Sequence, residues 1–233
     1  MMKNTINANQ KLGEVVSIFP GSSRIFNDVK IDYCCGGHDT LGEALKEKGI
    51  NSDEFIQKLN EEYEKFVESN EEYIDWRKEK PVKLMENIVD THHDYTKREL
   101  KEIDGLLSKI LKVHFGHHGE ELLKVHRLFG LLKIELEEHL IKEEENLFPL
   151  IEEYELTKDE NVKREIDKFI KETEDEHDKA GDILKELEKI TRDFKAPEGA
   201  CTSYKLAYDK IHSLEKDLFI HIYKENSVLF EML

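Results

Sequence analysis

The chain has 233 residues, of which 38% are hydrophobic and 37% are charged, and its formal net charge is −17. That balance is typical of amphipathic helices around a narrow apolar core, and it opposes binding to the phosphate backbones of nucleic acids. No apolar run approaches the roughly 20 residues of a membrane span, so we expect neither nucleic acid nor membrane as a partner.

The N-terminus and the cysteines indicate a cytoplasmic protein. The opening stretch, MMKNTINANQKLGEVVSIFPG, lacks the continuous apolar segment of a secretory signal. Three cysteines, two of them adjacent, do not resemble a disulfide framework. We therefore expect a cytoplasmic location.

Residues 1–60 are predicted to form a small helical N-terminal domain. Thr40 can cap a short helix that begins at Leu41, because Glu43 occupies the third position of a capping box. Gly49 is placed to end that helix. A domain of this size buries little apolar surface and needs support from a partner or from the rest of the chain.

Residues 61–80 are charged and act either as a linker or as a helical extension, and residues 81–233 are predicted to form an antiparallel four-helix bundle. Apolar residues recur at helical spacing in four long stretches, and short breaks such as HFGHHG and KAPEGACT separate them. The predicted helices cover roughly 82–112, 118–153, 160–192 and 202–231. The fold class is all-α.

A ten-residue pattern occurs twice, as HLIKEEENLF at 139–148 and HIYKENSVLF at 221–230. In each copy a histidine precedes a glutamate by four residues, so the two side chains share one face of a helix. A single such pair is ordinary on the surface of an acidic helical protein. Both copies lie beside the apolar stripe, however, and burying such groups is unfavourable unless they are paired or bind a metal.

The other two predicted helices supply one histidine each, His93 and His177. The chain thus contains two helical hairpins, each with a histidine followed by a His-x-x-x-Glu motif. Imidazoles and bridging carboxylates suit two iron ions, whereas a single zinc ion needs only four ligands. We predict an open di-iron centre, oxo- or carboxylate-bridged, with room for an oxygen ligand or a diatomic molecule. The predicted ligands are His93, His139, Glu143, His177, His221 and Glu225.

Other histidines fit this centre less well. His92 points about 100° away from His93 on a helix, so at most one of the two faces the core, and the Asp that follows both His93 and His177 favours His93. His114 lies about 31 Å further along a straight helix. Glu176 is either a partner of the ligands or, more in keeping with its acidic surroundings, a solvated acid.

The second unusual stretch is Cys34-Cys35-Gly36-Gly37. Adjacent cysteines form a disulfide only through a strained ring, so they are more often free thiols, redox partners or ligands of soft metals. Burial as two small apolar side chains is the alternative. We predict a redox or iron-transfer role for Cys34 and Cys35.

These residues together resemble a known family. DYCCGG followed by TLGEAL resembles the small N-terminal domain of the iron–sulfur cluster repair di-iron proteins (Repair of Iron Centres, ScdA/YtfE type). The His93, His139, Glu143, His177, His221 and Glu225 series resembles their hemerythrin-like bundle, and ACTSYK is also similar. The resemblance begins near residue 8 and runs to the end; LFEML replaces the commoner LFP in the last motif.

The resemblance implies a non-haem di-iron protein that repairs iron–sulfur clusters damaged by nitrosative or oxidative stress, by supplying iron. It implies terminal histidine ligands and bridging glutamates, damaged iron–sulfur proteins as partners, and nitric oxide or dioxygen as small ligands. It leaves open assembly as a homodimer.

Two alternatives stay open: a nitric oxide reductase, and a hemerythrin-type protein that binds or senses dioxygen or nitric oxide. The cysteine-bearing domain has no evident use in a simple carrier, and this favours repair.

Overall fold

The computed structural model describes residues 5–35, 37–69 and 72–233. The chain divides into two compact units. One unit comprises the residues up to Leu84 together with Phe219–Leu233, and the other comprises Met85–Leu218. Each unit is described by itself below. None of the helices in the described ranges combines the length and the apolar character that crossing a membrane requires.

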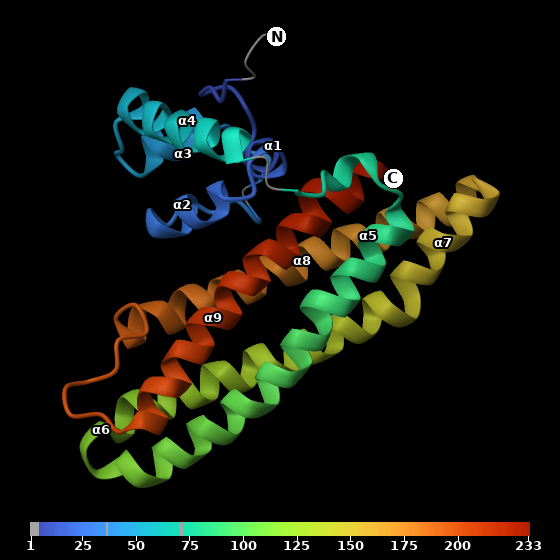
Figure 1. Ribbon diagram of the computed structural model, residues 1–233. Coiled ribbons are helices and arrows are strands. Elements are labelled where there is room, and N and C mark those ends of the chain that lie inside the picture. Colours follow the sequence, from blue (N-terminus) through green and yellow to red (C-terminus); the bar gives the residue numbers. More distant parts are fainter. Residues whose placement is uncertain (1–4, 36, 70–71) are drawn as a thin grey trace. The chain divides into compact units, whose positions relative to one another are not determined.

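Four helices lie in the N-terminal part of the first unit (Figure 1). The Thr40 side chain accepts the Glu43 amide and the Glu43 carboxylate accepts the Thr40 amide, which is the predicted capping box at the start of α3. Gly49 follows this helix with φ +67°, a conformation that a glycine adopts without strain. The helices are α1 (Leu12–Ile18), α2 (Ser22–Asp28), α3 (Leu41–Glu47) and α4 (Ser52–Ser69).

The described residues between 61 and 80 include the end of one helix and a short helical turn. Helix α4 extends to Ser69, and a short 3-10 turn, η1 (Trp76–Lys78), precedes α5 (Pro81–Ile88). Asp75 forms ion pairs with Arg77 at 2.8 Å and with Lys78 at 3.0 Å, within the segment that precedes α5.

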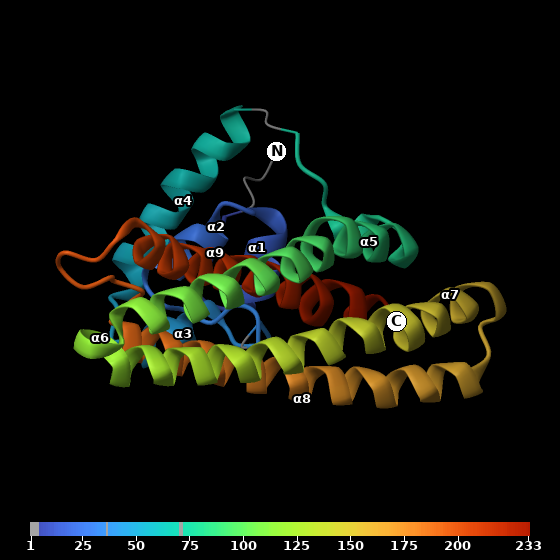
Figure 2. The ribbon, with the colours of Figure 1, turned by 90° about the horizontal axis from the view of Figure 1, so that it is seen from below.

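The second unit is a bundle of long antiparallel helices, as the sequence predicts. Helix α6 (Asp94–Lys142) is a hairpin in itself, because His118 has non-helical dihedral angles (φ −131°, ψ 18°) and the chain reverses there. Figure 2 shows its second arm, which ends at Lys142, running beside α8 (Glu160–Thr191). The sequence predicted a longer break at HFGHHG; one residue accomplishes the reversal. Helices α7 (Phe148–Thr157) and α9 (Thr202–Lys224, to Leu218 in this unit) complete the bundle.

The apolar stripes predicted from the sequence form the core of this bundle. Leucines and isoleucines at helical spacing on both arms of α6 are buried, as are those on α8 and α9. Their burial removes apolar surface from water, which is the main favourable term in folding. The fully buried members include Leu100, Ile103, Leu132, Leu184, Leu187, Ile211 and Leu214.

Candidate metal centre

Three of the predicted ligands lie in π-helical turns rather than in regular α-helix. His93 ends the turn η2 (Val89–His93), Glu143 begins η3 (Glu143–Leu147), and Glu225 begins η4 (Glu225–Leu229). A π turn widens the backbone by one residue and often marks a functional position in a helix. The sequence prediction assumed regular α-helical spacing throughout. That spacing holds for the helices leading to these residues, but not for the π-helical turns in which the residues lie.

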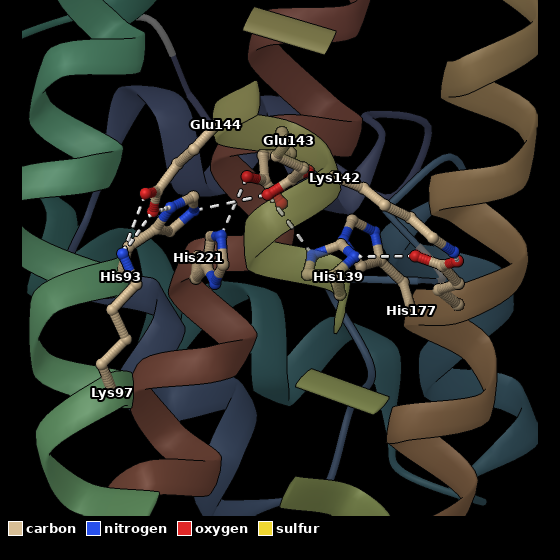
Figure 3. A network of polar contacts seen from close by, with 10 residues as sticks. His93, Lys97, His139, Lys142, Glu143, Glu144, His177 and His221 are labelled. Carbon is tan, nitrogen blue, oxygen red and sulfur yellow. Dashed lines mark hydrogen bonds and ion pairs between the residues drawn. The ribbon is translucent and has the colours of Figure 1, made fainter. Parts of the chain in front are cut away.

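Within the second unit, Glu143 lies between two imidazoles. Its Oε2 is 3.3 Å from Nε2 of His93 and 3.4 Å from Nε2 of His139. His177 approaches from α8, with its Nε2 3.3 Å from Nε2 of His139. Figure 3 shows these three histidines directed toward Glu143 from different helices. Each of the four residues is at most 3% exposed.

Two further carboxylates hold the outer nitrogens of these imidazoles. Nδ1 of His93 is 2.7 Å from Glu144, and Nδ1 of His139 is 3.1 Å from Glu176. Each carboxylate thus accepts a proton carried on Nδ1 and leaves Nε2 with the lone pair that a metal needs. Figure 3 shows the contact between His93 and Glu144.

A lysine neutralises each outer carboxylate. Lys97 binds Glu144 at 2.7 Å, and Lys142, the lysine of the repeated sequence pattern, binds Glu176. The hydrogen bond with His139, supported by Lys142, lowers the pKa of Glu176 to about 2 although burial opposes this. Burial also opposes ionisation of Glu144, but Lys97 and His93 outweigh it and its pKa is lowered. Both groups are therefore carboxylates, and Glu176 is not a merely solvated acid.

His92 and His93 are both buried, at 5% and 0% exposure, but they face different partners. His92 lies in the π-helical turn η2, and its Nδ1 is 3.1 Å from the half-buried Asp217 on α9. His93 instead stacks on Phe148, with ring centroids 5.8 Å apart.

The remaining predicted pair lies in the first unit. His221 is on the last turn of α9 and Glu225 begins η4; Nε2 of His221 is 2.8 Å from Glu225 Oε1. Both side chains are buried, at 1% and 0% exposure. The second copy of the repeat therefore folds as the first copy does, with a buried imidazole and a buried carboxylate one turn apart.

The two predicted thiols lie in a loop of the same unit. Cys34 is buried, Cys35 is half-buried, and both are free. Their sulfurs are 3.8 Å apart. Asp32, which the sequence analysis did not single out, contacts Cys34 at 3.1 Å.

Other histidines are used elsewhere. Nε2 of His114 lies 3.2 Å from the exposed Cys201, and His126 contacts Ser108 at 3.1 Å. His212 stacks on Phe194. These contacts lie elsewhere in the second unit, and the predicted ligand set does not include these histidines.

The donor chemistry fits iron. Imidazole nitrogen and carboxylate oxygen are ligands that iron accepts, and a carboxylate with two oxygens can join two metals. Oε2 of Glu143 lies near an imidazole nitrogen on each of two sides, so these three donor atoms converge. The four side chains of the second unit therefore form a buried site suited to a redox-active cation.

Comparisons with known proteins define the class. Residues 84–233 match the hemerythrin HHE cation-binding domain, and residues 8–63 match the ScdA N-terminal domain, a domain of unknown function. The protein is therefore a hemerythrin-like, all-α protein preceded by a small ScdA-type domain.

Full-length relatives define the family. A probable iron–sulfur cluster repair protein of Haemophilus influenzae is 30% identical, and the match covers 96% of each chain. The repair protein YtfE of Escherichia coli is 31% identical over 95% of each chain, and ScdA of Staphylococcus epidermidis is 29% identical over 94% of this chain and 96% of its own. The chain belongs to the iron–sulfur cluster repair family.

Proposed function

We propose that this protein repairs iron–sulfur clusters damaged by nitrosative or oxidative stress and that it does so by supplying iron. The printed names of its relatives support repair. The observation that carries the proposal is Glu143, whose Oε2 lies 3.3 Å and 3.4 Å from two imidazole nitrogens in a buried site. The targets would be damaged iron–sulfur proteins in the cytoplasm, where the three free thiols stay reduced.

The proposed centre holds two irons. His93, His139, His177 and His221 would be terminal ligands, and Glu143 and Glu225 would bridge. The repeated pattern supports the pairing of Glu143 with Glu225, because both are fully buried and each begins a π-helical turn four residues after a histidine. When bound, iron would supply redox and Lewis-acid chemistry.

The chain's own residues prepare the site for such ions. Glu144 and Glu176 keep the protons of His93 and His139 on Nδ1. Burial excludes bulk water and strengthens each electrostatic contact. Two imidazoles and two bridging carboxylates for each iron leave coordination positions open, which supports release of the ion to a target.

The same open positions support a second candidate function. A diatomic molecule such as nitric oxide or dioxygen could bind there, which would make the protein a nitric oxide reductase or a hemerythrin-type binding protein. The thiols favour repair: a simple carrier has no use for Cys34 and Cys35, whose redox or iron-transfer role completes the proposal.

Iron content tests the centre. We expect Glu143→Gln and Glu225→Gln to lose most of the iron that the wild-type protein retains, because a bridging position can no longer carry negative charge. Glu145→Gln is the matched control, since this glutamate is exposed on the same turn as Glu143. Elemental analysis would contradict the assignment if both bridging variants kept full iron.

A repair assay tests the function. The iron-loaded protein should restore activity to a dehydratase whose cluster has been damaged by nitric oxide, and the two iron-poor variants should not. Equal recovery with wild-type and iron-poor protein would exclude iron supply.

A further inference from the structure

The loop before α3 gathers three metal-binding side chains within four consecutive residues. Asp32, Cys34 and Cys35 each offer a ligand atom, and the three atoms lie within 4.8 Å of one another. Cys34 Sγ is 3.1 Å from Asp32 Oδ1 and 3.8 Å from Cys35 Sγ. We call these three residues the thiol cluster.

The backbone holds the thiol cluster in place. The Cys35 amide donates to Asp32 Oδ1 at 3.1 Å, so the carboxylate is fixed beside both sulfurs. Between them in sequence, Tyr33 anchors the loop: its ring is 1% exposed and packs 6.0 Å from Phe26 and 6.3 Å from Tyr223. The loop is therefore preorganised around a buried aromatic side chain.

Two glycines bring this loop against the turn that carries Glu225, within the same unit. The Gly13 amide donates to the Gly37 carbonyl at 3.1 Å. A Cβ on Gly13 would lie 2.6 Å from Oγ of Ser227, and one on Gly37 would lie 2.9 Å from the Tyr33 carbonyl and closer still to the Ser227 hydroxyl. Ser227 lies in η4, two residues after Glu225, so the thiol-bearing loop packs directly on a ligand-bearing turn.

The sulfur separation matches a metal ion better than a disulfide. A disulfide requires about 2.05 Å between sulfurs. A tetrahedral ion with metal–sulfur bonds of about 2.3 Å places two sulfur ligands about 3.8 Å apart. The observed 3.8 Å therefore admits an ion between the sulfurs without moving them.

The electrostatics of the thiol cluster also favour a cation. All three groups are acidic, and crowding them disfavours their charged forms. The hydrogen bond with Cys35, burial and the charge of Asp32 raise the pKa of the Cys34 thiol. A bound cation would remove this repulsion, because both sulfurs would then bind as thiolates.

We propose that Asp32, Cys34 and Cys35 form a second metal site, which takes up one ferrous ion in transit between the bundle and a target. The inference rests on the proposed iron supply and names the side chains that pass the ion on. Two thiolates and one carboxylate suit Fe(II) and other borderline divalent ions. Three protein ligands leave a position that a ligand of the target can enter.

The uptake step is an exchange of protons for metal, without electron transfer. Two thiols and one carboxylate bind one divalent ion, and the two thiol protons pass to solvent. Release reverses the step as the target's own thiolates replace Cys34 and Cys35. No oxidant or reductant is required.

Cobalt(II) is the probe, because a thiolate-to-cobalt charge-transfer band appears only when sulfur binds the ion. The full-length protein with Cys201→Ser serves as the parent, so that the contact between Cys201 and His114 cannot contribute. We expect one equivalent of thiolate-bound cobalt and release of about two protons. Cys34→Ser and Cys35→Ser should abolish the two-thiolate band.

Asp32→Asn is the decisive variant, because asparagine still accepts the Cys35 amide but carries no charge. Cobalt affinity should fall at least tenfold in Asp32→Asn and stay unchanged in Asp39→Asn, the exposed control on the same loop. A band absent from the parent, or an affinity unaffected by Asp32→Asn, would overturn the proposal. In wild-type protein, bound metal should also protect Cys34 and Cys35 from alkylation; lack of protection would overturn it without any variant.

The failure of this inference can be told apart from failure of the repair function. Glu143→Gln should lose iron from the bundle and keep the cobalt–thiolate band. A protein that repairs clusters but shows no band retains the proposed function and loses the thiol cluster. A protein that shows the band but does not repair clusters retains the thiol cluster as a metal site and loses the proposed repair function.

Discussion

The His/Glu site of the bundle and the thiol cluster of the loop present their candidate metal ligands in opposite ways. In the bundle, His93, His139 and Glu143 come from helical segments, and Glu144 and Glu176 fix the two imidazoles. In the loop, three ligand side chains come from four consecutive residues, and one amide orients them. On the proposed function, the first arrangement would hold iron, and the second would exchange its ion when a short segment moves.

The largest expected effect is a loss of iron affinity when the carboxylates that hold the bundle imidazoles are replaced. Glu176→Gln and Glu144→Gln should each weaken iron binding by about 10–100-fold, because the Nδ1 proton is no longer held by a charge and Nε2 is a poorer donor. Competition with a chelator measures the affinity. Glu172→Gln, an exposed position on the helix that carries Glu176, is the control. If all variants bound iron with equal affinity, Glu144 and Glu176 would have no role in iron binding.

A smaller effect is expected from filling the close contact beneath the loop. Gly37→Ala should destabilise the first unit by about 1–3 kcal/mol, because the new Cβ meets the Tyr33 carbonyl and the Ser227 hydroxyl. Urea denaturation measures the loss. Gly105→Ala provides a control of opposite sign: this helical glycine has open space around it, and alanine there should stabilise by up to about 1 kcal/mol. If Gly37→Ala were as stable as Gly105→Ala, the loop would not be packed as described.

The smallest effect is on thiol reactivity. Because the pKa of Cys34 is raised, its thiol stays protonated at neutral pH, and its thiolate fraction grows only as the pH rises toward that value. At about pH 8, iodoacetamide should modify Cys34 at least roughly tenfold more slowly than the exposed Cys201. Asp32→Asn should narrow the difference, since one cause of the raised pKa is removed. Peptide mass spectrometry across a pH series resolves the two rates, and equal rates would show that the surroundings of Cys34 do not suppress its thiolate.

Local chemistry explains how much of the fold could be read from the sequence. The capping box of Thr40 and Glu43 depends on two residues three apart, and it forms as predicted. The buried stripes of the bundle follow from apolar spacing alone. The reversal was predicted across the whole of HFGHHG, whereas it takes place at His118 alone, because the glycines of this stretch weaken a helix without deciding which residue departs from it.

The candidate site shows where such reading stops. A repeated histidine–glutamate pattern selects His139, Glu143, His221 and Glu225, but their assignment as ligands stays a prediction. Glu144 could not be picked out among 52 acidic residues, and Glu176 was considered as a partner of the ligands but not chosen, because their role depends on which imidazole lies across the bundle. Asp32 was missed for a similar reason. Its distance to Cys34 depends on the conformation of a loop, and a loop has no repeating residue spacing from which contacts can be predicted.

The π-helical turn η3 sets a rotational phase along its helix. Each residue of an α-helix advances the chain by about 100°, but a π turn accommodates one additional residue within its turn. Deleting one residue between Glu143 and Leu147 would let this turn close to regular α-helix, and Phe148 and Ile151, buried at 6% and 0% exposure, would still face the core. The change would fall on the direction of the side chains within the turn itself. The extra residue thus lets one segment aim a carboxylate in one direction and its following apolar side chains in another.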